Sequence, residues 1–125
     1  MRYLVLLLLA ASPMAYAGKY RPIYNADFSY DSNIHNAQVK KAIKKSLISR
    51  GWTMGDAKRG KIKAKIFLRT HVAEVVITYG GGNIKIDYVT STNLGYRMKK
   101  GQPLIHRNYN NWIINLERDI SVNLT

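Results

Sequence analysis

The sequence has 125 residues, of which 20 are lysine or arginine and 7 are aspartate or glutamate, for a formal net charge of +13. It contains no cysteine, which excludes disulfides, so the domain has to fold on its apolar core alone. A charge balance this basic favours anionic partners, such as lipid head groups, acidic polymers or an acidic protein.

Residues 1–17 are typical of a secretory signal peptide. Arg2 precedes an uncharged apolar run over residues 3–11, and Ala15 and Ala17 place small side chains where a signal peptidase requires them. The run is too short to cross a bilayer, which takes about 20 apolar residues. We therefore expect cleavage after Ala17, no transmembrane span afterwards, and a periplasmic or secreted bacterial protein. Export also argues against nucleic acid as the partner.

Residues 18–35 are expected to form an N-terminal arm, and residues 36–125 a single domain. Apolar and polar residues alternate within the arm, with the period of a half-buried strand, at Tyr24, Ala26, Phe28 and Tyr30. The arm is expected either to pair at a sheet edge or to stay extended. The domain begins with a helix predicted over residues 36–50, which Gly51 ends. Its apolar stripe consists of Val39, Ala42, Ile43 and Leu47.

Three or four strands are predicted next. The first covers residues 52–54 and is followed by a turn over residues 55–60. The second covers residues 61–69, with Ile62, Ala64, Ile66 and Leu68 on one face. The apolar positions then change from even to odd numbers, which requires a turn or a bulge between Arg69 and Val72. The third strand ends at a glycine hairpin over residues 80–83, and the last covers residues 83–92.

A loop is predicted over residues 99–103, and a second helix over residues 105–120. The buried stripe of this helix is expected to consist of Ile105, Tyr109, Trp112, Ile113, Leu116 and Ile120. Two one-sided helices and an antiparallel meander bury their apolar faces best as a two-layer α+β sandwich. We therefore predict both helices on one face of the sheet, in the order α-β-β-β-β-α, and an open second face.

Basic residues at alternate positions give the open face its first candidate site. Lys61, Lys63 and Lys65 lie about 6.6 Å apart, within one Debye length, so they act together on an anion. The full set of anion-binding candidates is Lys61, Lys63, Lys65, Arg69 and Lys85. The alternative is an ordinary solvated sheet face whose lysines only discourage edge pairing.

Apolar residues on the same face suggest a second kind of site. The candidates for a protein interface or a homodimer contact are Phe67, Val72, Val76 and Val89. Scattered exposed valines are, however, also common in strands without any such role.

A third candidate is an aromatic pocket where the second helix meets the sheet, formed by His71, His106, Tyr109 and Trp112. Simple packing of the helix would explain the same residues. If His71 and His106 converge, they would permit acid–base chemistry of a hydrolase or nuclease. No nucleophile motif, phosphate loop or paired carboxylates are present, and the few acidic residues predict no metal site. We expect no cofactor and no enzymatic activity.

The chain resembles a family of small uncharacterised bacterial periplasmic proteins and lipoproteins. The resemblance covers about residues 37–122 and is strongest over residues 105–113, where the motif reads I-H-R-N-Y-N-x-W-I. It implies an exported α+β domain and assigns no catalytic residue. The leading expectation is a non-enzymatic binding or accessory protein of the cell envelope. The alternatives are a protein-interaction or homodimerisation module and a small histidine-dependent hydrolase.

Overall fold

The computed structural model describes residues 18–125, so the predicted signal peptide and its cleavage site at Ala17 lie outside the described residues. The elements in chain order are β1 (Tyr20–Pro22), β2 (Ala26–Ser29), α2 (Asn36–Ser49), β3 (Trp52–Lys58), β4 (Lys61–Leu68), β5 (His71–Gly80), β6 (Asn83–Thr92), β7 (Arg97–Lys99), β8 (Gln102–His106) and α3 (Arg107–Asn123). No helix among these residues is long and apolar enough to cross a membrane.

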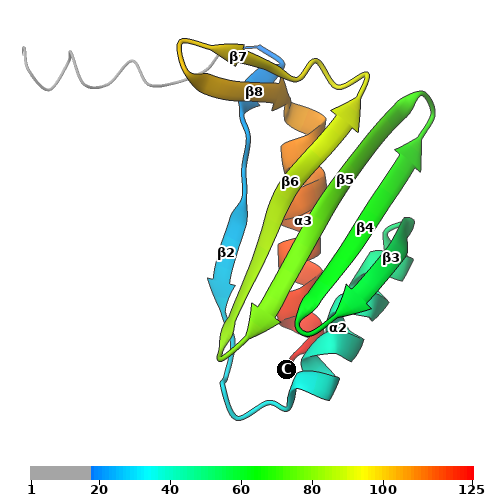
Figure 1. Cartoon of the computed structure of the whole chain (residues 1–125), viewed down its shortest axis with the longest axis vertical. Coiled ribbons are helices and arrows are strands. Elements are labelled where there is room, and N and C mark those ends of the chain that lie inside the picture. The colour runs from blue at the N-terminus through cyan, green and yellow to red at the C-terminus, as the bar shows by residue number, and fades with distance from the viewer. Residues whose placement is uncertain (1–17) are drawn as a thin grey trace, which may run out of the picture.

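The main sheet is antiparallel and has five strands in the order β2-β6-β5-β4-β3. Helices α2 and α3 pack against each other and together cover one face of this sheet, as Figure 1 shows. The predicted α+β arrangement of two helices on a meander is therefore confirmed. The arm adds to it, because β2 pairs with β6 at the sheet edge, where Ala26 lies opposite Ile86.

The core lies between the sheet and the two helices. Alternate residues of β4, β5 and β6 are buried there, as expected for a sheet with one covered face. The helices contribute one stripe each, because residues three or four positions apart share a helix face. The fully buried large side chains are Tyr109, Ile43, Leu47, Ile62, Ile77, Ile84, Ile86, Ile105, Ile113, Leu116, Ile120 and Val39.

The change of parity between β4 and β5 comes from a two-residue turn. Ile66 pairs with Ala73 and Leu68 with His71, so only Arg69 and Thr70 connect the strands. Arg69 has a φ of 58°, in the left-handed region that such a tight turn requires. The prediction of a turn before Val72 is confirmed, but Leu68 is exposed rather than inward.

Two segments differ from the prediction. Strand β3 continues to Lys58 instead of ending at residue 54, because a register shift between Met54 and Ala57 absorbs the Gly55-Asp56 pair within the strand. The true turn consists of Arg59 and Gly60. Residues 99–103 were predicted as a loop and residues 105 and 106 as the start of a helix. They lie instead in the β7–β8 hairpin, which pairs with β1 in a separate three-stranded sheet.

Polar contacts tie the helices to each other and to the arm. Arg50, which caps α2, donates hydrogen bonds of 2.6 Å and 3.1 Å to the Asp119 carboxylate on α3. The side chain of Asn110 donates to the Pro22 carbonyl and accepts from the backbone N–H of Tyr24. These contacts fix α3 between the arm and α2, and so set where the start of α3 lies relative to the sheet.

Candidate anion-binding site

Lysine side chains project from the outer face of β4. Lys61 and Lys63 are exposed and Lys65 is half-buried, whereas Ile62 and Ala64 between them are buried under the helices. Alternate residues of a strand point to opposite faces, so the lysines lie on the face that α2 and α3 leave uncovered. The structure therefore places these three predicted residues together and accessible to a ligand.

The β3–β4 hairpin adds a lysine that was not predicted from the sequence. Lys58 is the cross-strand partner of Lys61 in the last pair of β3 and β4. The turn between them is tight, because a Cβ on Gly60 would lie 2.7 Å from the carbonyl oxygen of Tyr79. Lys58 was missed because β3 was predicted to end at residue 54, before it reaches this position.

Acidic residues divide the outer face of the sheet. Lys65 forms an ion pair of 3.5 Å with Glu74 on β5. Lys85, another predicted member of the patch, pairs across strands with Asp27 of β2 and lies two strands away from Lys61. Strands are about 4.8 Å apart, so Lys61 and Lys85 are separated by about 10 Å, with a carboxylate beside Lys85. Lys85 is thus not part of a continuous basic cluster.

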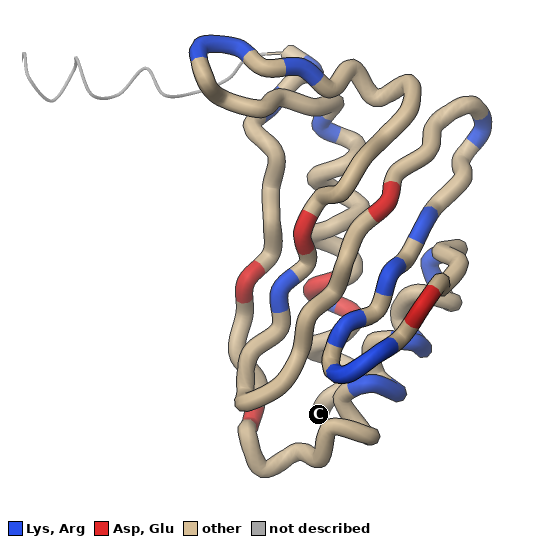
Figure 2. Tube along the Cα trace, viewed as in Figure 1, with Lys and Arg blue, Asp and Glu red and all other residues tan. Residues whose placement is uncertain are grey.

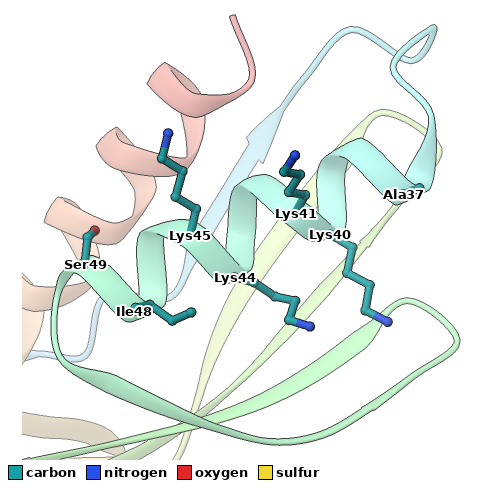
Figure 3. A pocket seen from close by; sticks show the side chains of 7 residues that line it. All are labelled: Ala37, Lys40, Lys41, Lys44, Lys45, Ile48 and Ser49. Carbon is teal, nitrogen blue, oxygen red and sulfur yellow. The ribbon is translucent and has the colours of Figure 1, made fainter.

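Helix α2 supplies a second row of cations next to the hairpin. It packs against β3 and contains Lys40, Lys41, Lys44 and Lys45 but no acidic residue. Figure 3 shows Lys40 and Lys44 extending from one side of the helix, toward the hairpin, and Lys41 and Lys45 from the other. These two pairs of lysines on α2 border a shallow depression whose apolar lining includes Ala37 and Ile48. Ile48 is 62% exposed.

The lysines of the β3–β4 hairpin that form no ion pair with any described residue and the two α2 lysines that extend toward this hairpin (Figure 3) form what we call the basic edge. It lies on both sides of β3. Figure 2 shows lysines and arginines gathered on the β3–β4 hairpin and on α2. The basic edge consists of Lys40, Lys44, Lys58, Lys61 and Lys63. Among residues 18–125, none of the five has a carboxylate oxygen within 4.0 Å, since the two ion pairs found there involve Arg50 and Lys65.

The interface candidates do not form one apolar patch. Phe67 is 62% exposed and lies opposite Val72, with the Lys65 ammonium 5.5 Å from the centre of its ring. Val76 is on the same face but four residues further along β5, beyond Glu74. Val89 is the unpaired residue of a bulge in β6, because Glu74 pairs with Thr90 and the next residue, Val75, with Tyr88.

Three of the four residues predicted to form an aromatic pocket line the same cavity. His71, His106 and Trp112 line a cavity of about 160 Å³ together with Leu68, Arg69, Leu94 and Asn108. Tyr109 does not line it, since its side chain is completely buried in the core and packs edge-on against Tyr88, with ring centres 5.6 Å apart. Arg69, predicted as part of the lysine patch, lies in the β4–β5 turn and belongs to this cavity instead.

Both histidines of the cavity are held by hydrogen bonds at Nδ1. His71 Nδ1 lies 2.6 Å from the carbonyl oxygen of Asn93, and His106 Nδ1 accepts from the backbone N–H of Asn108 at 3.1 Å. Burial and the positive charges of Arg107 and Lys19 lower the pKa of His106 below its usual value. Within the described part of the chain, no three histidine or acidic side chains converge as a metal site would require.

Comparison of the chain with models of protein families, with curated proteins and with solved structures finds no match. The resemblance over residues 37–122 therefore stays a prediction, and the argument about function depends on the geometry of this chain alone.

Proposed function

We propose that this protein is an exported, non-enzymatic domain that binds the anionic lipid surface of a bacterial cell envelope through its basic edge. Export is the prediction from residues 1–17, and removal of Arg2 with that segment would leave a net charge of +12. A protein with this charge is attracted to any anionic surface. The basic edge is a part of it where five lysines gather without an ion-pair partner among the described residues, although Asp56 borders a depression beside Lys63.

The observation that carries the proposal is the pairing of Lys58 with Lys61. Like charges directly opposite each other on neighbouring strands destabilise a sheet. Lys40 and Lys44 on the adjacent helix add to the same positive field. An arrangement that costs stability in the free protein is favourable once an anionic surface neutralises it.

The apolar lining next to the lysines favours a lipid surface over a soluble acidic polymer. Ile48 lies one helical turn from Lys44 and is largely exposed. A bilayer interface can bury such a side chain while the lysine ammonium groups remain among the phosphates. Full burial of an isoleucine contributes about 1.5–3 kcal/mol, and each lysine near an anionic surface about 1 kcal/mol. For the five lysines and Ile48 the sum is about 6.5–8 kcal/mol, which corresponds to reversible adsorption with a dissociation constant of about 1–20 micromolar.

Co-sedimentation with vesicles tests the proposal. The mature protein should bind vesicles that contain phosphatidylglycerol but not vesicles of phosphatidylcholine alone, and the bound fraction should fall as salt rises from 50 to about 500 mM. Ile48→Ala should weaken binding several-fold. Val122→Ala is the matched control, because Val122 is equally exposed, at 63%, on the other helix.

Two results would contradict the proposal. One is an absence of binding to anionic vesicles at low salt. The other is binding to a soluble acidic polymer that Ile48→Ala leaves unchanged while vesicle binding is absent, which would identify a polymer as the partner.

A further inference from the structure

The cavity between the β4–β5 turn and the start of α3 has a positive lining. Its polar side chains are Arg69, His71, His106 and Asn108, and no acidic residue is among the seven that line it. Lys19 and Arg107 are close enough to His106 to act on its charge. None of the basic-edge lysines borders this cavity, so its ligand chemistry is a separate question from adsorption to a surface.

The hydrogen bond between His71 and Asn93 determines which ring nitrogen of His71 can accept a hydrogen bond from a ligand. A carbonyl oxygen can only accept, so the 2.6 Å contact with Asn93 requires a proton on His71 Nδ1. In a neutral imidazole the other nitrogen then has no proton. In that neutral form His71 Nε2 is an acceptor and can take a hydrogen bond from a hydroxyl group.

His106 has the opposite arrangement. Its Nδ1 accepts the backbone N–H of Asn108 and thereby caps α3, so in a neutral ring the proton is on Nε2. His106 Nε2 is therefore a donor. It lies at the N-terminal end of a helix whose first turn contains no acidic residue, and the helix dipole at that end favours negative charge.

The size of the cavity restricts the ligand. A volume of about 160 Å³ corresponds to roughly five water molecules at liquid density. A phosphate group is smaller than this volume, so it fits into the cavity together with bound water, whereas a whole nucleotide would have to extend into solvent.

We propose that this cavity is a binding site for a phosphate group that carries a hydroxyl, as hydrogen phosphate and protonated phosphate monoesters do. The phosphate hydroxyl donates to His71 Nε2, and the anionic oxygens accept from His106 Nε2, Arg69 and the Asn108 side chain. The single acceptor in the site, His71 Nε2, favours hydrogen phosphate over sulfate. Sulfate has the same shape but no hydroxyl at neutral pH, so it cannot donate to this nitrogen. The inference goes beyond the proposed function, because it needs neither a lipid surface nor the basic edge.

The test is a titration of the mature protein with inorganic phosphate at pH 7, followed by ¹⁵N NMR of the imidazole rings. Phosphate should produce saturable shifts of the ring nitrogens of His71 and His106 but not of His35. Sulfate should bind at least about tenfold more weakly, because it leaves His71 Nε2 without a donor. Equal binding of sulfate and phosphate, or no saturable shift with either, would overturn the assignment.

Two variants keep the local structure while removing the ligand-facing nitrogen. His106→Asn retains a side chain that caps helices well, and His71→Asn retains an N–H donor for the Asn93 carbonyl. Each should lose at least about tenfold in phosphate affinity, with thermal unfolding showing that the fold persists. His35→Asn is the matched control, since His35 precedes α2 without a side-chain cap and does not line the cavity.

Two further comparisons identify the source of the phosphate group. At pH 7 glycerol 1-phosphate is mostly the dianion without a hydroxyl on phosphorus, so it should compete more weakly than inorganic phosphate binds. Dimethyl phosphate, a diester without a hydroxyl on phosphorus, should not compete. Competition by dimethyl phosphate would contradict the role of His71. The double variant with Lys61→Glu and Lys63→Glu should have an unchanged phosphate affinity, within about twofold. Loss of vesicle binding and loss of phosphate binding at the cavity can therefore be distinguished.

Discussion

Lys58 and Lys61 face each other across the last pair of the β3–β4 hairpin, and no carboxylate among residues 18–125 forms an ion pair with either of them. The turn that brings them together is a two-residue connection of Arg59 and Gly60 with positive φ values of 43° and 80°. Such a turn fixes the register, so the two ammonium groups cannot avoid each other by a slip of the strands. The repulsion is part of the fold and leads to the first prediction.

Lys61→Glu should stabilise the free protein. The substitution converts a like-charge pair with Lys58 into an opposite-charge pair, and such cross-strand pairs contribute about 0.2–1 kcal/mol. The free energy of unfolding should rise by that amount at low salt in urea denaturation, and the gain should shrink in 1 M salt. Lys85→Glu is the control, because it creates a like-charge pair with Asp27 and should destabilise. A loss of stability in Lys61→Glu would contradict the argument.

Tyr109→Phe should be neutral or stabilising, by up to about 1 kcal/mol. The Tyr109 hydroxyl is buried and has no hydrogen-bond partner within the part of the chain that the structure describes. Its removal therefore relieves a desolvation cost and breaks no bond. In contrast, the Tyr88 hydroxyl pairs with the Ser91 side chain at 2.7 Å, so Tyr88→Phe should cost about 0.5–1.5 kcal/mol. Thermal unfolding of both variants makes the comparison. A large loss in Tyr109→Phe would show that the hydroxyl is satisfied.

Asp119→Asn should remove a pH-dependent part of the stability. The hydrogen bonds from Arg50 hold the pKa of the Asp119 carboxyl below its usual value. A carboxyl with a depressed folded-state pKa contributes stability above its unfolded pKa of about 3.9, and this contribution disappears as pH falls through the lower folded value. The wild type should thus be more stable than Asp119→Asn at pH 7. The difference should vanish in acid. A difference that stays constant between pH 7 and pH 2 would contradict this role.

Much of the fold could be predicted because its periodicities are local. The alternation along β4 and β5 and the stripe of Val39, Ile43 and Leu47 each follow from one buried face, and a buried face repeats every two residues in a strand and about every 3.6 in a helix. The same logic placed Lys61 and Lys63 on the open face.

The predictions of secondary structure were wrong where two backbone conformations fit the same pattern of apolar and polar residues. Ile105 has helical spacing to Tyr109 and is buried, but it reaches the core from β8, and α3 begins two residues later at Arg107. Asp56 follows a glycine and was assigned to a turn, whereas a register shift keeps it in β3. Ile105 is buried and Asp56 is exposed, as either backbone conformation would leave them, so the pattern of apolar and polar residues cannot distinguish the two conformations.

The candidate sites depend on contacts between distant segments, which sequence spacing does not encode. The basic edge needs α2 to lie beside β3, and the phosphate cavity needs the β4–β5 turn beside the start of α3. His71 and His106 could be named as candidates from their residue type. Arg69 was predicted only as part of the lysine patch, and Leu94 and Asn108 were not predicted at all, because only the packed structure shows that these three residues line the same cavity.

The most direct test of the central claim compares two double variants that change the net charge equally. Lys61→Glu with Lys63→Glu alters the basic edge, and Lys99→Glu with Lys100→Glu alters the exposed tip of the β7–β8 hairpin at the other end of the molecule (Figures 1 and 2). If the basic edge is the lipid-binding surface, the first double variant should weaken binding to phosphatidylglycerol vesicles by at least about 2 kcal/mol, or roughly 30-fold, because each substitution removes an attracted charge and adds a repelled one. The second double variant should weaken binding by no more than about threefold. Equal losses in both double variants would show that only the total charge matters and would contradict the proposal.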